Sequence, residues 1–229
     1  ADGQHFRSSS SEGMAIRQAN GIPLDAMVVG FVGRIVMDKG IVELERAWRA
    51  IRDAFPDTHL LLVGPREPED PVPAGTLAGL ASDPRVHFVG FSAGMRSYYA
   101  AMDVLVLPTY REGFPNALLE AAAMELPVVA TAVTGCVDAV VDGVTGILVP
   151  PRDPGALASA IQRLLSDPAL RRKMGKAGRE RVLREFRPES IWAALYAEYA
   201  ALLKEKGLPL PGGTRREAAE TACRAATVA

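Results

Sequence analysis

Two carboxylates flank a predicted turn in the stretch YREGFPNALLEA (residues 110–121), with seven residues between Glu112 and Glu120. A carboxylate only accepts hydrogen bonds, and it can accept both protons of a vicinal diol. We therefore expect each glutamate to hold neighbouring hydroxyl groups of a polyol such as a sugar. The alternative, from residue type alone, is that Glu112 is solvated and Glu120 serves as a cap or acts on a helix dipole.

The segment between the two glutamates is predicted to begin a helix at an anion site. Asn116 is a favoured N-cap residue, and Pro115 precedes it. Such a cap leaves the next amides of the helix free to bind an anion, here those of Ala117, Leu118 and Leu119. Phosphates between two groups that bind diols describe a nucleotide sugar, which is the ligand we expect.

Two cations follow a glycine in the stretch GRIVMDKG (residues 33–40). Gly33 allows a tight turn, Arg34 can bind phosphate oxygens bidentately, and Lys39 adds a point charge. This combination suits a diphosphate, although two solvated surface charges would give the same pattern. The stretch matches neither the dinucleotide fingerprint nor the P-loop, because Lys39 precedes its glycine.

Six short apolar runs must position these residues. They are continuously hydrophobic, as strands buried on both faces are, and they cover residues 27–33, 59–64, 86–90, 103–108, 127–131 and 146–150. Helix-length stretches alternate with them. This pattern predicts an α/β protein with a Rossmann-like, doubly wound parallel sheet of about six strands. Ligands of such sheets bind beyond the carboxyl ends of the strands, where both charged stretches fall.

Beyond Pro151 the sequence predicts additional C-terminal helices. Asp153 and Pro154 mark the start of the first, and two more helices follow over residues 168–186 and 188–206, with Gly207 as the stop. The predicted organisation is therefore a linker over residues 1–26, a Rossmann-like nucleotide-sugar-binding domain over residues 27–206 and a loose tail over residues 207–229.

The composition argues against several classes of function. The net charge of −1 over 229 residues gives no general attraction to nucleic acid or to an anionic membrane. No apolar run approaches the roughly 20 residues of a membrane helix. Cys136 and Cys223 imply no disulfide framework, so a cytoplasmic protein is expected. The histidines have no metal-ligand spacing and no D-x-D occurs, so we expect neither a metal nor another cofactor.

Four stretches together resemble the C-terminal half of the retaining nucleotide-sugar glycosyltransferases with the GT-B fold, family four of their sequence classification. They are GRIVMDKG, VHFVGF, EGFPNALLEAAAMELPVVAT and VVDGVTGILVPPRD, within a resemblance that runs from about residue 27 to 206. The variants REGFPN and TGCVDAVVDG resemble the bacterial branch that builds capsule, O-antigen and exopolysaccharide. The sequence departs from the family pattern at Met124-Glu125 and at Thr134-Gly135, where further glycines are usual.

The resemblance implies a role for each candidate residue. Arg34 and Lys39 would hold the donor diphosphate, and Glu112 would hold the donor sugar; these three are predicted to be catalytic. Glu120 would hold the ribose. The other binding residues lie in loops after the strands, with Phe91 and Ser92 along the base; the set is Gly33, Phe91, Ser92, Gly113, Phe114, Pro115, Asn116, Ala117 and Leu118.

The resemblance also implies a reaction and a second domain. A glycosyl group would move, with retention, from a nucleoside diphosphate (UDP is our guess) to a glycan or polyprenyl-linked acceptor. Family members carry an N-terminal Rossmann-like domain with the acceptor site. That domain is missing here, so we expect the isolated chain to be inactive. The helix around SIWAALYAEY would cross back onto the missing domain. The full-length enzyme would work in the cytoplasm, with peripheral association at the inner face of the membrane.

Two other interpretations stay open at this stage. A module that binds a nucleotide sugar or a partner protein without catalysis would carry the same motifs. An upstream Rossmann-like domain would favour the enzyme, whereas a start codon directly before Ala1 would favour the module. A receiver-like or flavodoxin-like signalling domain is the weaker alternative, because the first strand end has no acidic cluster.

Overall fold

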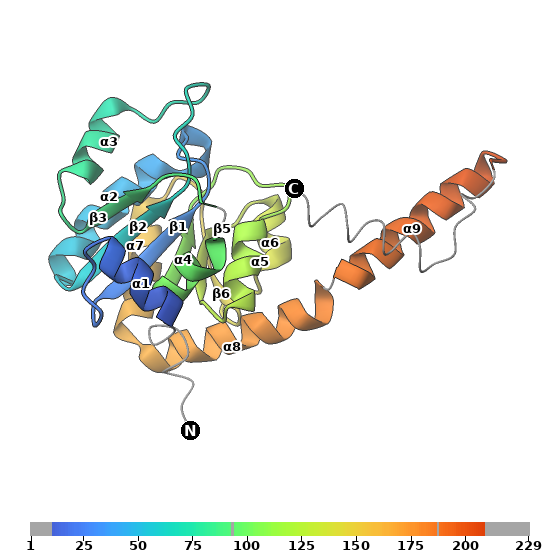
Figure 1. Cartoon of the computed structure of the whole chain (residues 1–229). Helices are drawn as coiled ribbons and strands as arrows, with labels where there is room; N and C mark the ends of the chain where they lie inside the picture. Colours follow the sequence, from blue (N-terminus) through green and yellow to red (C-terminus); the bar gives the residue numbers. More distant parts are fainter. Residues whose placement is uncertain (1–10, 93, 187, 209–229) are drawn as a thin grey trace. The chain divides into compact units, whose positions relative to one another are not determined.

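The computed structural model describes residues 11–92, 94–186 and 188–208 (Figure 1). The chain divides into two compact units, Ala1–Val182 and Leu183–Ala229. The last helix of the domain predicted over residues 27–206 falls in the second unit. Most of the predicted tail, residues 209–229, lies outside the described residues.

All six predicted strands are present in one parallel sheet, within two residues of the predicted ends. They are β1 (Met27–Val32), β2 (Thr58–Val63), β3 (Val86–Val89), β4 (Val104–Leu107), β5 (Val128–Thr131) and β6 (Gly146–Val149). Their order is β3-β2-β1-β4-β5-β6. The pairing of Val29 with both Leu60 and Val104 places β1 between β2 and β4. The strand order reverses between β1 and β4, and such a switch point is where ligands bind in open α/β sheets.

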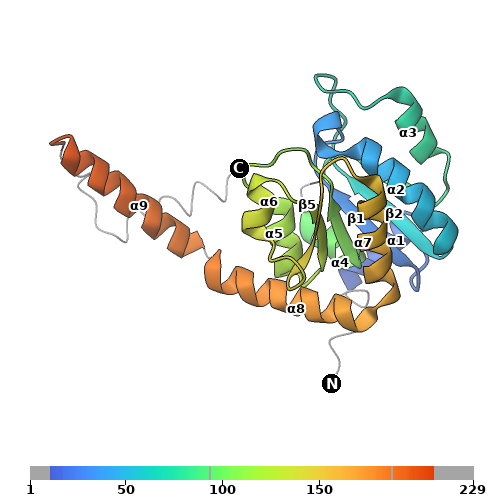
Figure 2. The same cartoon turned by 180° about the vertical axis from the view of Figure 1, so that it is seen from behind.

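Helices cover both faces of the sheet. The helices of the first unit are α1 (Ser11–Ala19), α2 (Ile41–Ala54), α3 (Ala74–Ala81), α4 (Met95–Ala101), α5 (Asn116–Ala123), α6 (Thr134–Ala139), α7 (Pro154–Ser166) and the greater part of α8 (Pro168–Glu185), with the 3-10 turn η1 (Met37–Lys39) before α2. Helices α2 and α7 pack together on one face (Figure 2). Helices α1 and α4 pack together on the other, beside α5 and α6 (Figure 1).

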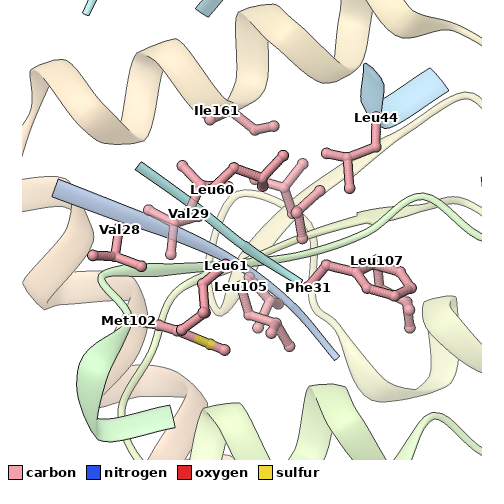
Figure 3. Close-up of a cluster of buried hydrophobic side chains, with 14 of the residues drawn as sticks. Val28, Val29, Phe31, Leu44, Leu60, Leu61, Met102, Leu105, Leu107 and Ile161 are labelled. Atoms are coloured by element: carbon pink, nitrogen blue, oxygen red, sulfur yellow. The ribbon is translucent and has the colours of Figure 1, made fainter. Parts of the chain in front are cut away.

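Apolar side chains fill the space between sheet and helices. Helix α2 buries an i, i+3, i+4 stripe that includes Leu44, Trp48 and Ile51, as an amphipathic helix should. Leu44 of α2 and Ile161 of α7 face the side chains of β1 and β2 on one side of the strands, and Met102 lies on the other side (Figure 3). The strands around the switch point therefore have little freedom to shift.

The predicted start of α7 is confirmed. The Asp153 carboxylate accepts a hydrogen bond from the amide of Ala156 at 2.8 Å, and Pro154 is the first helical residue. In the second unit, α9 (Pro188–Glu205) is followed by Gly207 in the left-handed conformation, as the sequence predicts. Trp192, Tyr196 and Tyr199 of α9 are exposed, and the partner expected for this helix stays a prediction.

The predicted N-terminal linker is wrong for residues 11–26; residues 1–10 lie outside the described part of the chain. Helix α1 packs against α4, and Arg17 is only 1% exposed. Its guanidinium lies 2.9 Å from the Asp103 carboxylate and donates to three carbonyl oxygens, those of Leu24, Ala26 and Ala101. This segment is therefore part of the folded unit.

Three arginines of α8 neutralise the carboxyl ends of other helices. Arg171 donates to the carbonyls of Leu164 and Leu165 at the end of α7, and Arg181 donates to those of Asp138 and Ala139 at the end of α6. Arg179 donates to the Ala123 carbonyl at the end of α5. Cations stabilise these ends because the last carbonyls lack partners and carry partial negative charge. The basic sequence of α8 thus has a structural use.

No helix in the described ranges combines the length and the apolar character that crossing a bilayer requires.

Candidate functional site

The two charged stretches meet at the switch point of the sheet. The loop after β1 and the loop after β4 are joined by hydrogen bonds from the Tyr110 amide (2.8 Å) and the Thr109 hydroxyl (3.1 Å) to the Asp38 carbonyl. Gly40 has φ of 69°, and a Cβ there would lie 1.9 Å from the Pro108 carbonyl oxygen. Only glycine fits this crossing, so the sequence fixes Lys39 beside the end of β4.

Gly33 turns the chain at the end of β1. Its φ of 153° lies outside the range that L-residues favour. Its carbonyl oxygen touches the next strand end, because a Cβ on Gly64 would lie 1.9 Å from it. The backbone of β1 and β2 is therefore close-packed at the edge where a ligand would approach.

Lys39 and Glu112 form an ion pair at the centre of this edge. Lys39 Nζ lies 2.6 Å from Glu112 Oε2, and the side chains are only 14% and 17% exposed. A pair so far removed from water stabilises each partner only while the other is present. A diphosphate that bound Lys39 would compete with Glu112 for the ammonium group, so the predicted functions of the two residues would be coupled.

Arg34 is more exposed than Lys39 and has a different partner. Its guanidinium is 2.6 Å from the Glu67 carboxylate, and its side chain is 54% exposed. The hydrogen bond and charge of Glu67 raise the pKa of Arg34, which stays a cation. Exposed ion pairs are weak, so Glu67 competes little with a phosphate for this guanidinium.

The first turn of α6 supports the loop that carries Glu112. The Gly135 amide donates to the Glu112 carbonyl at 3.0 Å, and a Cβ at Gly135 would lie 2.6 Å from the carbonyl oxygens of Glu112 and Gly113. This chain has Thr134 where the family pattern has a further glycine, but it keeps Gly135, which makes this contact. Neighbouring Cys136 is buried, which raises the pKa of its thiol to about 12 and keeps it neutral.

The predicted cap of α5 is wrong. Pro115 is the N-cap, Asn116 is the first helical residue, and the Asn116 side chain makes no capping hydrogen bond. The Pro115 carbonyl accepts the amides of Leu118 (2.9 Å) and Leu119 (3.3 Å), so these amides are not free for an anion as expected. The helix begins one residue early because Pro115 itself supplies the first acceptor.

Glu120 is exposed and has a partner that the sequence analysis missed. Its Oε2 accepts a hydrogen bond from the Tyr99 hydroxyl at 2.7 Å, and Tyr99 itself is 2% exposed. Tyr99 lies 21 positions earlier on α4, in a stretch that the sequence shows only as part of a helix. No local signal could have identified this contact.

The remaining candidates lie at the same edge of the sheet, on exposed loops. Phe91, 83% exposed, and Ser92 follow β3, and the Ser92 hydroxyl accepts from the Gly94 amide at 3.2 Å. Gly113 and Phe114 are exposed beside Glu112. Within the described ranges, no hydrogen bond joins Phe91 or Ser92 to the Lys39–Glu112 pair. Nor do the described side chains include three His, Cys, Asp or Glu placed to hold a metal ion.

Known proteins with similar sequences show the family to which the chain belongs. Residues 26–167 match the family model described as glycosyl transferases group 1. The capsular polysaccharide biosynthesis glycosyltransferase CapM of Staphylococcus aureus is 40% identical over 181 residues, which is 79% of this chain and 48% of CapM. The chain thus spans about half the length of this relative.

Two solved structures share the fold. Sucrose-phosphate synthase from Thermosynechococcus elongatus is 39% identical with a TM-score of 0.73, over 84% of this chain and 49% of that one. Anabaena HepE in complex with UDP-glucose is 25% identical with a TM-score of 0.77, over 86% of this chain and 54% of that one. The Rossmann-like prediction for the sheet is confirmed.

Proposed function

Because the chain belongs to the glycosyl transferases of group 1, we propose that it forms the part of such an enzyme that binds the nucleoside-diphosphate sugar. The observation that carries this proposal is the Lys39–Glu112 pair at the switch point. The pair places a cation that can bind phosphate, Lys39, next to a carboxylate that can accept hydroxyl protons, Glu112. The complex of HepE with UDP-glucose supports the same class of ligand.

The proposal assigns each side chain one contact. Lys39 and Arg34 both bind the diphosphate, and both stabilise the negative charge that develops as the sugar departs. Glu112 accepts hydroxyl protons of the transferred sugar, and Glu120 accepts those of the ribose. Phe91, exposed on the loop after β3, offers a ring for stacking on the base beside Ser92. Gly33 and residues 113–118 form the wall along the phosphates.

The whole reaction needs groups beyond this chain. We propose transfer with retention to a hydroxyl of a glycan or lipid-linked acceptor in the cytoplasm, at the inner face of the membrane, and the similarity to CapM supports a capsule-type polysaccharide. The acceptor site would lie in the half of the relatives that this chain does not match, so this chain alone would transfer no sugar. A binding module without catalysis is the alternative.

The direct test is a calorimetric titration of the 229-residue chain with UDP, GDP and ADP. We expect one of them to bind with the same affinity in buffer and in EDTA, because the cations proposed for the diphosphate are Lys39 and Arg34. Loss of binding on chelation would show that a metal holds the phosphates. Absence of binding by all three nucleotides would contradict the donor site.

The ion pair predicts an unusual effect of Glu112→Gln. Affinity for the free nucleoside diphosphate should rise by about two- to fivefold, because Lys39 loses its competing partner and a carboxylate no longer repels the phosphate. Affinity for the nucleotide sugar should not gain in the same way, since the sugar loses its acceptor. Glu180→Gln on exposed α8 is the matched control. Weaker binding of the free diphosphate to Glu112→Gln would contradict this coupling.

A further inference from the structure

Tyr99 is a buried residue whose one polar atom contacts the predicted ribose site. Its ring lies in the hydrophobic core, on α4, with 2% of the residue exposed. Its hydroxyl reaches Glu120 on α5 at 2.7 Å, and α5 is the helix that begins at the end of the Glu112 loop. The buried Tyr99 thus donates a hydrogen bond to the carboxylate of the exposed Glu120.

The hydroxyl of Tyr99 is a permanent donor in this contact. Burial raises the pKa of Tyr99, and the hydrogen bond to Glu120 raises it further, so the phenol keeps its proton at neutral pH. The described residues leave no buried side-chain nitrogen or oxygen without a partner, and Glu120 is the acceptor that satisfies this hydroxyl. The direction of the hydrogen bond is therefore settled: Tyr99 donates and the carboxylate accepts.

The contact leaves Glu120 able to bind a diol. A carboxylate has about four acceptor positions on its two oxygens, and Tyr99 occupies one of them on Oε2. The Glu120 residue is exposed, and Oε1 and the second position of Oε2 accept no other hydrogen bond from the described residues. One hydroxyl on each oxygen is the geometry that a carboxylate offers to the neighbouring 2′- and 3′-hydroxyls of a ribose.

We propose that Tyr99 is a positioning residue that fixes the Glu120 carboxylate to read both ribose hydroxyls of the bound nucleotide. An exposed glutamate side chain has several rotamers, and ligand binding must otherwise select one of them. Tyr99 makes that selection before the ligand arrives, so the site favours ribonucleotides over deoxynucleotides. This inference rests on the proposed donor site and adds a residue and a selectivity to it.

The test compares, in the full chain, the dissociation constants of a ribonucleotide and of its dideoxy analogue. Dissociation constants are determined for whichever of UDP, GDP or ADP the native chain binds, and for the 2′,3′-dideoxy analogue of that nucleotide. Tyr99→Phe should weaken binding of the ribonucleotide about tenfold or somewhat less, the value of one lost positioning hydrogen bond, and leave the dideoxy analogue unchanged. In the Glu120→Gln background, Tyr99→Phe should cause a much smaller further loss of affinity for the ribonucleotide. Tyr98→Phe, on the same helix, is the matched control and should change neither ligand.

Four outcomes would be decisive against the inference or its premise. Equal weakening of both ligands by Tyr99→Phe, or a lower melting temperature with an unchanged ratio, would show that Tyr99 is only structural. Additive effects of the two substitutions would show that Tyr99 does not act through Glu120. If the native chain binds the ribonucleotide and its dideoxy analogue equally, the ribose role of Glu120 in the proposed function fails, independently of Tyr99.

Discussion

Lys39→Ala is expected to lower the affinity of the chain for nucleoside diphosphates by about ten- to a hundredfold. A hydrogen bond to a charged group contributes roughly 1.5–3 kcal/mol, and about 1.4 kcal/mol corresponds to one decade in affinity. The substitution also leaves Glu112 without its counter-ion, so a carboxylate then faces the phosphates. Arg34→Ala should have the smaller effect, because Arg34 is exposed and its interactions are screened by water.

The controls for Lys39→Ala separate charge from structure. Lys173→Ala removes an exposed cation of α8 and should leave nucleotide affinity unchanged. The double variant Lys39→Ala/Glu112→Gln should bind better than Lys39→Ala alone, because the unpaired carboxylate is gone. Calorimetric titration with the nucleoside diphosphate measures the affinity of the native chain and of each of these variants. A native-like affinity of Lys39→Ala would remove Lys39 from the site.

Arg17→Met is expected to lower the free energy of unfolding of the first unit by about 3 kcal/mol, the lower end of the cost of breaking a buried ion pair from one side, because Arg17 is buried but the Asp103 side chain is 23% exposed. Asp103 keeps one partner, the Val28 amide at 2.8 Å, but its charge loses the guanidinium, and three carbonyl oxygens lose a donor. For a unit of this size the melting temperature should fall by roughly 10 °C.

Thermal unfolding followed by circular dichroism checks this prediction. Arg46→Met, an exposed arginine of α2, is the matched control and should change the melting temperature by little. Arg17→Met combined with Asp103→Asn should be less destabilised than the sum of the single variants, since neither charge is then left without its partner. A melting temperature of Arg17→Met within a degree or two of the native value would show that α1 is not part of the cooperative unit.

The elements of the fold were predictable because each is encoded locally. The continuous apolar runs of β1 to β6 are typical of strands that are buried on both faces, and Asp153-Pro154 is a start signal that acts within one turn. The position of the candidate site is predicted from the same pattern, since Lys39 and Glu112 lie in the segments that follow β1 and β4, the strands that flank the switch point.

The contacts that were missed join residues far apart in the chain. Arg17 and Asp103 are 86 positions apart, and Tyr99 and Glu120 are on different helices. Nothing near Arg17 distinguishes it from a surface arginine, so residues 11–26 were interpreted as a linker. The cap of α5 failed for a different reason. Asn116 has the right side chain, but the carbonyl of the preceding proline accepts the first amides, a backbone choice that residue preferences do not show.

The central claim is that a nucleoside diphosphate binds at the switch point by displacing Glu112 from Lys39. A crystal structure of the chain with the nucleoside diphosphate that it binds tests this most directly. We predict the diphosphate beside Lys39 Nζ at the ends of β1 and β4, the ribose hydroxyls on Glu120, and the Lys39–Glu112 ion pair broken. A nucleotide bound elsewhere, or a diphosphate at this edge with Lys39 still paired to Glu112, would contradict the account.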